Sequence, residues 1–169
     1  GIQMSMGHTS ALYDEAVGAY DAGVNSITHF YSMCSGVTRR NALRYAGVIE
    51  AGYLLDGIYV ETIGDGIHLP EPLLRLIWKV KGPDRIVGIT DAMRGAGMPD
   101  GPTILGSLDD GMAAIIEDGV AKLPDRSSFA GSVCTTDRVV RNYMTKAGAS
   151  LPEAVQVMTL SPARLMRID

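Results

Sequence analysis

Four polar side chains able to do acid–base or metal chemistry follow short apolar stretches of this sequence. They are His8, His29, His68 and Asp91, spaced 21, 39 and 23 residues apart, and they include every histidine of the chain. Each apolar stretch predicts a strand. Parallel α/β folds gather the carboxyl ends of their strands at one edge, so we expect these side chains to meet there. Taken singly, each histidine is more simply a hydrogen-bonded structural residue, and Asp91 could be only a turn cap.

Together, the four residues suggest metal-assisted hydrolysis. Imidazoles on neighbouring strands suit Zn²⁺, whose sites are built from histidine nitrogen, cysteine sulfur and carboxylate oxygen. A carboxylate beside such an ion can carry the proton that the reaction must move. The pattern therefore predicts a zinc site with an acid next to it.

The elements that would hold these residues alternate between strand and helix. Strands are expected at 2–8, 24–31, 58–68 and 85–93. Helices are expected at 9–23, capped by Thr9 or Ser10 and ended by Gly23, at 38–52, closed by Gly52, and at 69–82, with Pro70 and Pro72 near its start and Gly82 at its end. This order is typical of parallel strands joined by helical crossovers.

The pattern changes after Met93. Residues 94–102 are rich in glycine and proline and predict a loop. A hairpin is expected at 112–124 with Asp118 and Gly119 as its turn. Helical segments follow at 131–148 and 150–168; Ser150 and Glu153 have the spacing of a capping box, and the helix restarts at Ser161–Pro162.

Composition limits the class of protein. The 169 residues suffice for one domain with a core, and a net charge of −4 argues against a nucleic-acid partner. No apolar run approaches the roughly 20 residues that span a bilayer, and no signal peptide is visible. Cys34 and Cys134 form no C-x-x-C pair, so we expect reduced thiols in a cytoplasmic protein. Because no initiator methionine begins the chain, we expect it to be part of a longer protein.

Six stretches of the sequence resemble one enzyme family. They are GHTSALYDEA, THFYSM, GDGIHLP and ITDAM, followed by FAGS at 129–132 and TLSPAR at 159–164. In this order they resemble the second half of the N-acetylglucosamine-6-phosphate deacetylases, which are amidohydrolases. The resemblance implies an α/β fold in which residues 1–169 form strands five to eight of a (βα)8 barrel followed by C-terminal helices. The first four strands and the family's small β domain would be absent.

The resemblance also implies a role for each site residue. His8 and His29 match the metal-binding histidines, Asp91 the catalytic general base, and His68 a histidine that contacts the sugar phosphate. Backbone amides after His29 hold phosphate in the family; Ser32 stands where the family has asparagine. The implied substrate-binding residues are Ser32, Met33, Arg40, His68, Phe129, Ala130 and Gly131.

Arg40 matches an arginine that reaches into the neighbouring subunit of a dimer to bind phosphate. Arg39 is the competing candidate, and a solvated helix start is the simpler interpretation of both arginines. A planar guanidinium matches phosphate geometry well, which favours phosphate binding.

The implied reaction is deacetylation of N-acetylglucosamine 6-phosphate to glucosamine 6-phosphate and acetate. It would use a divalent metal, expected to be zinc, in a homodimer. The family's remaining metal ligand, a glutamate, and the histidine that polarises the carbonyl come from earlier strands, so the 169-residue fragment is expected to be inactive. Two alternatives stay open: an amidohydrolase for another amide, and a non-catalytic half-barrel module.

Overall fold

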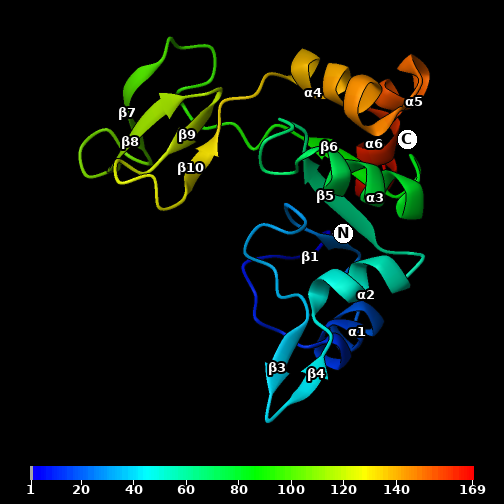
Figure 1. Cartoon of the computed structure of the whole chain (residues 1–169). Helices are drawn as coiled ribbons and strands as arrows, with labels where there is room; N and C mark the ends of the chain where they lie inside the picture. The colour runs from blue at the N-terminus through cyan, green and yellow to red at the C-terminus, as the bar shows by residue number, and fades with distance from the viewer. Residues whose placement is uncertain (1) are drawn as a thin grey trace.

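A four-stranded parallel sheet forms the centre of the protein. The computed structural model describes residues 2–169. The sheet contains β1 (Ser5–Met6), β2 (Ser26–Ile27), β5 (Tyr59–Ile63) and β6 (Ile86–Ile89), in the spatial order β1-β2-β5-β6. Every neighbouring pair is parallel, so all four carboxyl ends point the same way (Figure 1). The four predicted strands are thus confirmed, although all four are shorter than expected, β1 and β2 most of all.

Helices pack on this sheet and supply about half of its buried core. The crossovers carry α1 (Tyr13–Asp21), α2 (Val48–Leu54) and α3 (Glu71–Lys81). The chain ends with α4 (Thr136–Asn142), a π-helical turn (Tyr143–Ala147), α5 (Leu151–Gln156) and α6 (Leu160–Met166). Figure 1 shows α3 to α6 gathered around β5 and β6, with α1 and α2 near the other end of the sheet. Inward side chains of α1 to α5 and of the π-helical turn form one buried cluster with the strands.

The predicted helix starts are confirmed at α3 and α5 and wrong at α1, whose predicted end at Gly23 is confirmed. Helix α3 starts after Pro70 and ends at Gly82, and the Ser150 N–H donates to the Glu153 carboxylate at 2.8 Å before α5. Helix α1 begins later than expected, after Leu12, whose N–H donates to Glu15 at 2.7 Å. The Thr9 hydroxyl accepts a hydrogen bond from the Ala11 N–H instead, within the turn before the helix.

The helix predicted over 38–52 is wrong in its first half. Strands β3 (Thr38–Arg40) and β4 (Leu43–Tyr45) form a hairpin there. Asn41 and Ala42 turn the chain with φ of 48° and 68°, the left-handed pair that a two-residue hairpin turn requires. All six strand residues are exposed, so no apolar stripe is present to hold a helix against the core.

A second, antiparallel sheet replaces the single hairpin expected after Met93. It contains β7 (Gly101–Leu105), β8 (Met112–Glu117), β9 (Val120–Lys122) and β10 (Phe129–Ser132), in the order β10-β9-β8-β7. The β8–β9 turn at Asp118 and Gly119 is confirmed, with φ of 55° and 76°. The outer strands were missed because β7 opens on Gly101–Pro102 and β10 contains a glycine, and both look like loop. The helix expected from residue 131 therefore begins only at Thr136.

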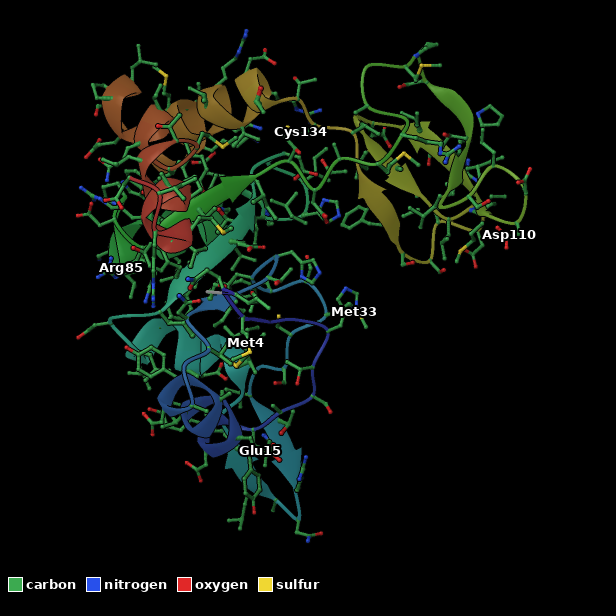
Figure 2. All side chains as sticks on the ribbon, turned by 180° about the vertical axis from the view of Figure 1, so that it is seen from behind. Met4, Glu15, Met33, Arg85, Asp110 and Cys134 are labelled. Carbon is green, nitrogen blue, oxygen red and sulfur yellow. The ribbon has the colours of Figure 1, made fainter. Side chains whose placement is uncertain are left out.

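Two chain segments connect the antiparallel sheet to the rest of the protein, one after β6 and one before α4 (Figure 1). Cys134 lies in the second of these, and Asp110 lies at the far tip of the sheet (Figure 2). Among the described residues, none of the helices has the length and apolar character needed to cross a bilayer.

Gly52 lies in the middle of α2 and does not end it, contrary to the prediction. A Cβ there would lie 2.5 Å from Cε2 of Phe30 and 2.9 Å from Cδ1 of Ile27, both buried. We expect Gly52→Ala to lower the free energy of unfolding by about 1–3 kcal/mol, because overpacking outweighs the better helix propensity of alanine. Urea unfolding measures the change.

The matched control is Gly18→Ala in α1, where an added Cβ meets nothing within 4 Å. This substitution should be neutral or stabilise the protein by up to about 1 kcal/mol. Equal effects of the two substitutions would contradict the close approach of α2 to Phe30.

Candidate active site

The four strand-end residues meet in one pocket. His8 lies two residues after the end of β1, His29 two residues after β2, and Asp91 two residues after β6. His68 lies five residues after the end of β5. All four line a cavity of about 300 Å³ at the carboxyl ends of the parallel strands. The remaining residues around this cavity are Ser32, Met33, Ile63, Phe129 and Gly131. The structure therefore brings together residues from all four strands and from β10, while the roles assigned to them stay predictions.

Three of the four strand-end residues have a left-handed backbone. The φ angles of His8, His29 and Asp91 are 46°, 32° and 48°. This region is uncommon for residues other than glycine, although histidine and aspartate enter it more readily than most. Each such residue costs on the order of 1–3 kcal/mol, and such residues cluster at functional sites. The left-handed backbone of these three residues could not be predicted from their residue types.

The segment from β10 holds the backbone of Asp91 in place. The Ser132 N–H donates to the Asp91 carbonyl at 3.3 Å, and the Met93 N–H donates to the Ser132 carbonyl at 2.9 Å. Ser132 is fully buried, and its neighbour Gly131 lines the pocket. The antiparallel sheet is thus tied to the acid by backbone hydrogen bonds, and it supplies one wall of the site.

His8 and His29 form a close pair. Their ring centroids lie 4.7 Å apart at an interplanar angle of 66°. His29 is buried, and its Nδ1 has no hydrogen-bond partner in the part of the chain that the structure describes. A buried polar atom without a partner costs about 1–3 kcal/mol, so a ligand at this atom would remove a penalty. Two adjacent imidazoles with one such nitrogen fit a metal ion.

This pair is not a complete metal site. Within residues 2–169, no group of three or more histidine, cysteine, aspartate and glutamate side chains could hold a metal ion. Zinc takes at least three protein ligands in catalytic sites. His8 and His29 can therefore supply only part of such a coordination shell.

Glu61 is a second carboxylate at the site, and the sequence analysis missed it. It lies half-buried on β5. Burial raises the pKa of Glu61, the backbone N–H and ring of His29 lower it, and the charge of Asp91 raises it; the net shift is upward. The Glu61 carboxylate is therefore coupled electrostatically both to His29 and to the predicted general base, Asp91. A charged residue inside the apolar stretch IYVETI was the available signal, but Glu61 lies within its strand and not at its carboxyl end.

His68 is held between two partners. Its Nδ1 lies 2.6 Å from Oδ2 of Asp65, and its ring packs against Phe129 with 4.5 Å between centroids. Although burial works in the opposite direction, hydrogen bonds from His68 and from the backbone of Ile67 keep the pKa of Asp65 below its ordinary value. The carboxylate is therefore ionised at neutral pH.

The remaining predicted residues divide into two groups. Ser32, Met33, Phe129 and Gly131 line the main pocket, and Ala130 lines an adjoining one shared with His8, His29 and Asp91. Met33 lies on the side of the parallel sheet from which the antiparallel sheet extends (Figure 2).

Arg40 lies instead on the exposed β3–β4 hairpin, with its guanidinium 5.9 Å from the Tyr45 ring centroid. Arg39 pairs with Arg44 across the same hairpin. The chain does not bring either arginine into its own pocket, so the predicted role of Arg40 would be in a neighbouring subunit.

Comparison with known proteins identifies relatives over nearly the whole chain. The N-acetylglucosamine-6-phosphate deacetylase of Lysinibacillus sphaericus is 32% identical over 99% of this chain, which spans 41% of that protein. A candidate N-acetylgalactosamine-6-phosphate deacetylase of Escherichia coli (strain K12) is 33% identical over 83% of this chain and 78% of its own length. No protein-family model matches.

Solved structures agree with these relatives. The crystal structure of N-acetylglucosamine-6-phosphate deacetylase from Thermotoga maritima superposes with a TM-score of 0.88 at 33% identity, over 99% of this chain and 44% of that one. The Mycobacterium smegmatis enzyme was solved as a mutant in complex with N-acetyl-D-glucosamine-6-phosphate. It superposes with a TM-score of 0.88 at 31% identity, over 99% of this chain and 43% of that one. The resemblance seen in the sequence is confirmed, and the chain belongs to the family of N-acetylglucosamine-6-phosphate and N-acetylgalactosamine-6-phosphate deacetylases.

Proposed function

We propose that this chain is the part of a metal-dependent hydrolase that converts N-acetylglucosamine 6-phosphate to glucosamine 6-phosphate and acetate. The observation that carries the proposal is the convergence of His8, His29, His68 and Asp91 on one pocket. The names of the relatives support the substrate, as does the phosphosugar bound to the Mycobacterium smegmatis enzyme. Because the chain spans about two fifths of the Lysinibacillus sphaericus relative, the activity belongs to a longer protein.

The four parallel strands would be strands five to eight of a (βα)8 barrel. Their spatial order follows the sequence, with a helix in each crossover, and this is the arrangement that a barrel repeats. In barrels of this kind the active site lies at the carboxyl ends of the strands, where the pocket is found here.

His8 and His29 would hold a divalent metal, expected to be zinc, with the remaining ligands outside this chain. Such an ion, when bound, lowers the pKa of water and polarises the acetyl carbonyl. Two neutral imidazoles leave the charge of the ion uncompensated, so Glu61 and Asp91 would balance it electrostatically.

Asp91 would move the proton. Its carboxylate takes a proton from the attacking water and then gives it to the departing sugar amine, which is a poor leaving group unless protonated. The hydrogen bond from Ser132 to the Asp91 carbonyl fixes the backbone from which the carboxylate projects. The acid is therefore positioned before the substrate arrives.

The phosphate and the sugar would be held by other residues around the same pocket. His68 and the backbone around Ser32 and Met33 would contact the phosphate, and residues 129–131 of β10 would cover the sugar. Arg40 would reach the phosphate of a neighbouring subunit in a homodimer. Both cysteines are free thiols, which fits the expected cytoplasmic location.

N-acetylgalactosamine 6-phosphate is the second candidate substrate. The Escherichia coli (strain K12) relative carries that name and is 33% identical to this chain. The two sugars differ only in the configuration at one hydroxyl, so the same acid, metal and phosphate contacts would serve either.

Acetate release by the full-length protein tests the proposal. We expect kcat/KM for N-acetylglucosamine 6-phosphate to exceed that for unphosphorylated N-acetylglucosamine by about 10³ or more, because buried groups built for an anion reject a substrate without one. Equal rates on both sugars would indicate an amidohydrolase for another amide. A higher kcat/KM on N-acetylgalactosamine 6-phosphate would establish the second candidate.

A further inference from the structure

Asp65 is the first residue of the turn that carries His68 into the pocket, and both oxygens of its carboxylate have hydrogen-bond partners. The side chain has no exposed surface. Oδ1 accepts the backbone N–H groups of Ile67 at 2.8 Å and His68 at 2.9 Å, and Oδ2 lies 2.6 Å from Nδ1 of the His68 ring. One buried carboxylate therefore meets three donors from a single turn.

Side chains of α4 hold the same turn from behind. An Nδ2–H of Asn142 donates to the Gly64 carbonyl at 2.8 Å, and the guanidinium of Arg138 donates to the Asp65 carbonyl at 3.2 Å. Arg138 also donates to the Gly119 carbonyl at 3.2 Å, which links the turn to the β8–β9 hairpin. Neither the backbone nor the carboxylate of Asp65 can move without breaking several hydrogen bonds.

The chemistry of the pair fixes the proton on the ring. An ionised carboxylate only accepts hydrogen bonds, so the His68 nitrogen facing Asp65 must carry a hydrogen. That nitrogen is Nδ1. Because Asp65 occupies Nδ1, Nε2 is the nitrogen left for the pocket that His68 lines.

We propose that Asp65 is a positioning residue, which keeps the His68 proton on Nδ1 and presents Nε2 to the phosphate of the substrate. The identity of that anion rests on the proposed function, but the state of the ring does not. Without a hydrogen Nε2 is only an acceptor, so it can donate to a phosphate dianion only after taking a proton from solvent. The Asp65 carboxylate then balances the charge of the imidazolium, and no unpaired charge is left in the pocket.

A purely structural turn cap is the alternative, and the chain contains a matched example. Asp125 accepts the N–H of Ser127 at 3.0 Å and its hydroxyl at 2.7 Å, but it is exposed and faces no histidine. Asp125→Asn therefore changes a carboxylate of the same kind of turn without touching His68.

Nitrogen-15 NMR of the histidine rings in the 169-residue chain tests the proposal. The chain has three histidines, so His68→Gln identifies the His68 signals. At a pH about two units above the ordinary imidazole pKa of about 6.5, wild-type His68 should be the Nδ1–H tautomer. Asp65→Asn should shift it toward Nε2–H, since an amide has one acceptor oxygen for three donors, whereas Asp125→Asn should leave it unchanged.

A wild-type His68 that carries its proton on Nε2 overturns the proposal without any variant, and so does a tautomer that Asp65→Asn leaves unaltered. In the full-length protein, we expect Asp65→Asn to lower kcat/KM for the phosphosugar by about 10–100-fold, chiefly through KM. If the whole fall in kcat/KM came from kcat, with KM unchanged, the positioning role would be contradicted. If wild type deacetylates no phosphosugar, the proposed function fails while the tautomer still decides this inference.

Discussion

Asp91→Asn in the full-length protein should lower turnover by about 10²–10⁴-fold and leave substrate binding nearly unchanged. This is the usual contribution of a general acid–base group, and asparagine cannot take the proton from water at neutral pH. The substitution suits this position, because Asp91 has φ of 48° and asparagine tolerates the left-handed region well. The melting temperature should change by no more than about 2 °C. Steady-state kinetics and a thermal melt measure the two effects.

The same substitution separates catalysis from turn formation. If Asp91 only capped its turn, asparagine would be among the best replacements, and kcat would stay near the wild-type value. That result would sink the catalytic assignment. Asp91→Ala is the useful contrast: it should be as inactive as Asp91→Asn but less stable, because alanine resists positive φ. A large loss of melting temperature with asparagine as well would indicate a structural role.

Zinc affinity of the 169-residue chain should depend on His8 and His29 but not on His68. We expect weak binding, because two imidazoles are short of a full set of zinc ligands. Replacing either histidine with asparagine should weaken it by at least about 100-fold, since losing a ligand should cost no less than losing a residue that supports one. Asparagine preserves the left-handed backbone of both positions and is a poor zinc ligand. Isothermal titration gives the affinities.

His68→Asn is the matched control, because it changes the third imidazole lining the same pocket. It should leave zinc affinity within about threefold of wild type. Tight binding that survives the double substitution of His8 and His29 would place the metal elsewhere in the protein.

The sequence predicted those parts of the fold that depend on local patterns. Pro70 and Gly82 marked α3 because proline suits a helix start and glycine a helix end. The Asp118–Gly119 turn and the Ser150–Glu153 pair were equally local. The four strand-end residues could be predicted to converge because parallel strands share one carboxyl edge, a property of the fold class rather than of any contact.

The features that could not be predicted depend on tertiary contacts. Arginine, alanine and leucine in TRRNALRY favour a helix by propensity, yet no apolar stripe anchors one, and the segment forms the β3–β4 hairpin. Strand β10 is recognisable only through its pairing with β9. Glu61 is linked to the site through the influence of His29 and Asp91 on its pKa, which a period of two along β5 does not reveal.

The left-handed backbone at His8, His29 and Asp91 also limits which sequences these positions can accept. Valine, isoleucine and threonine are penalised there whatever the reaction, whereas asparagine and glycine enter at little cost. Random libraries at the three positions, screened only for folded protein, should therefore be rich in asparagine, glycine, aspartate and histidine. A descendant that lost the chemistry while keeping the fold would tend to carry asparagine or glycine at these places. Its inactivity would then be visible in the sequence, while its backbone would remain that of an active enzyme.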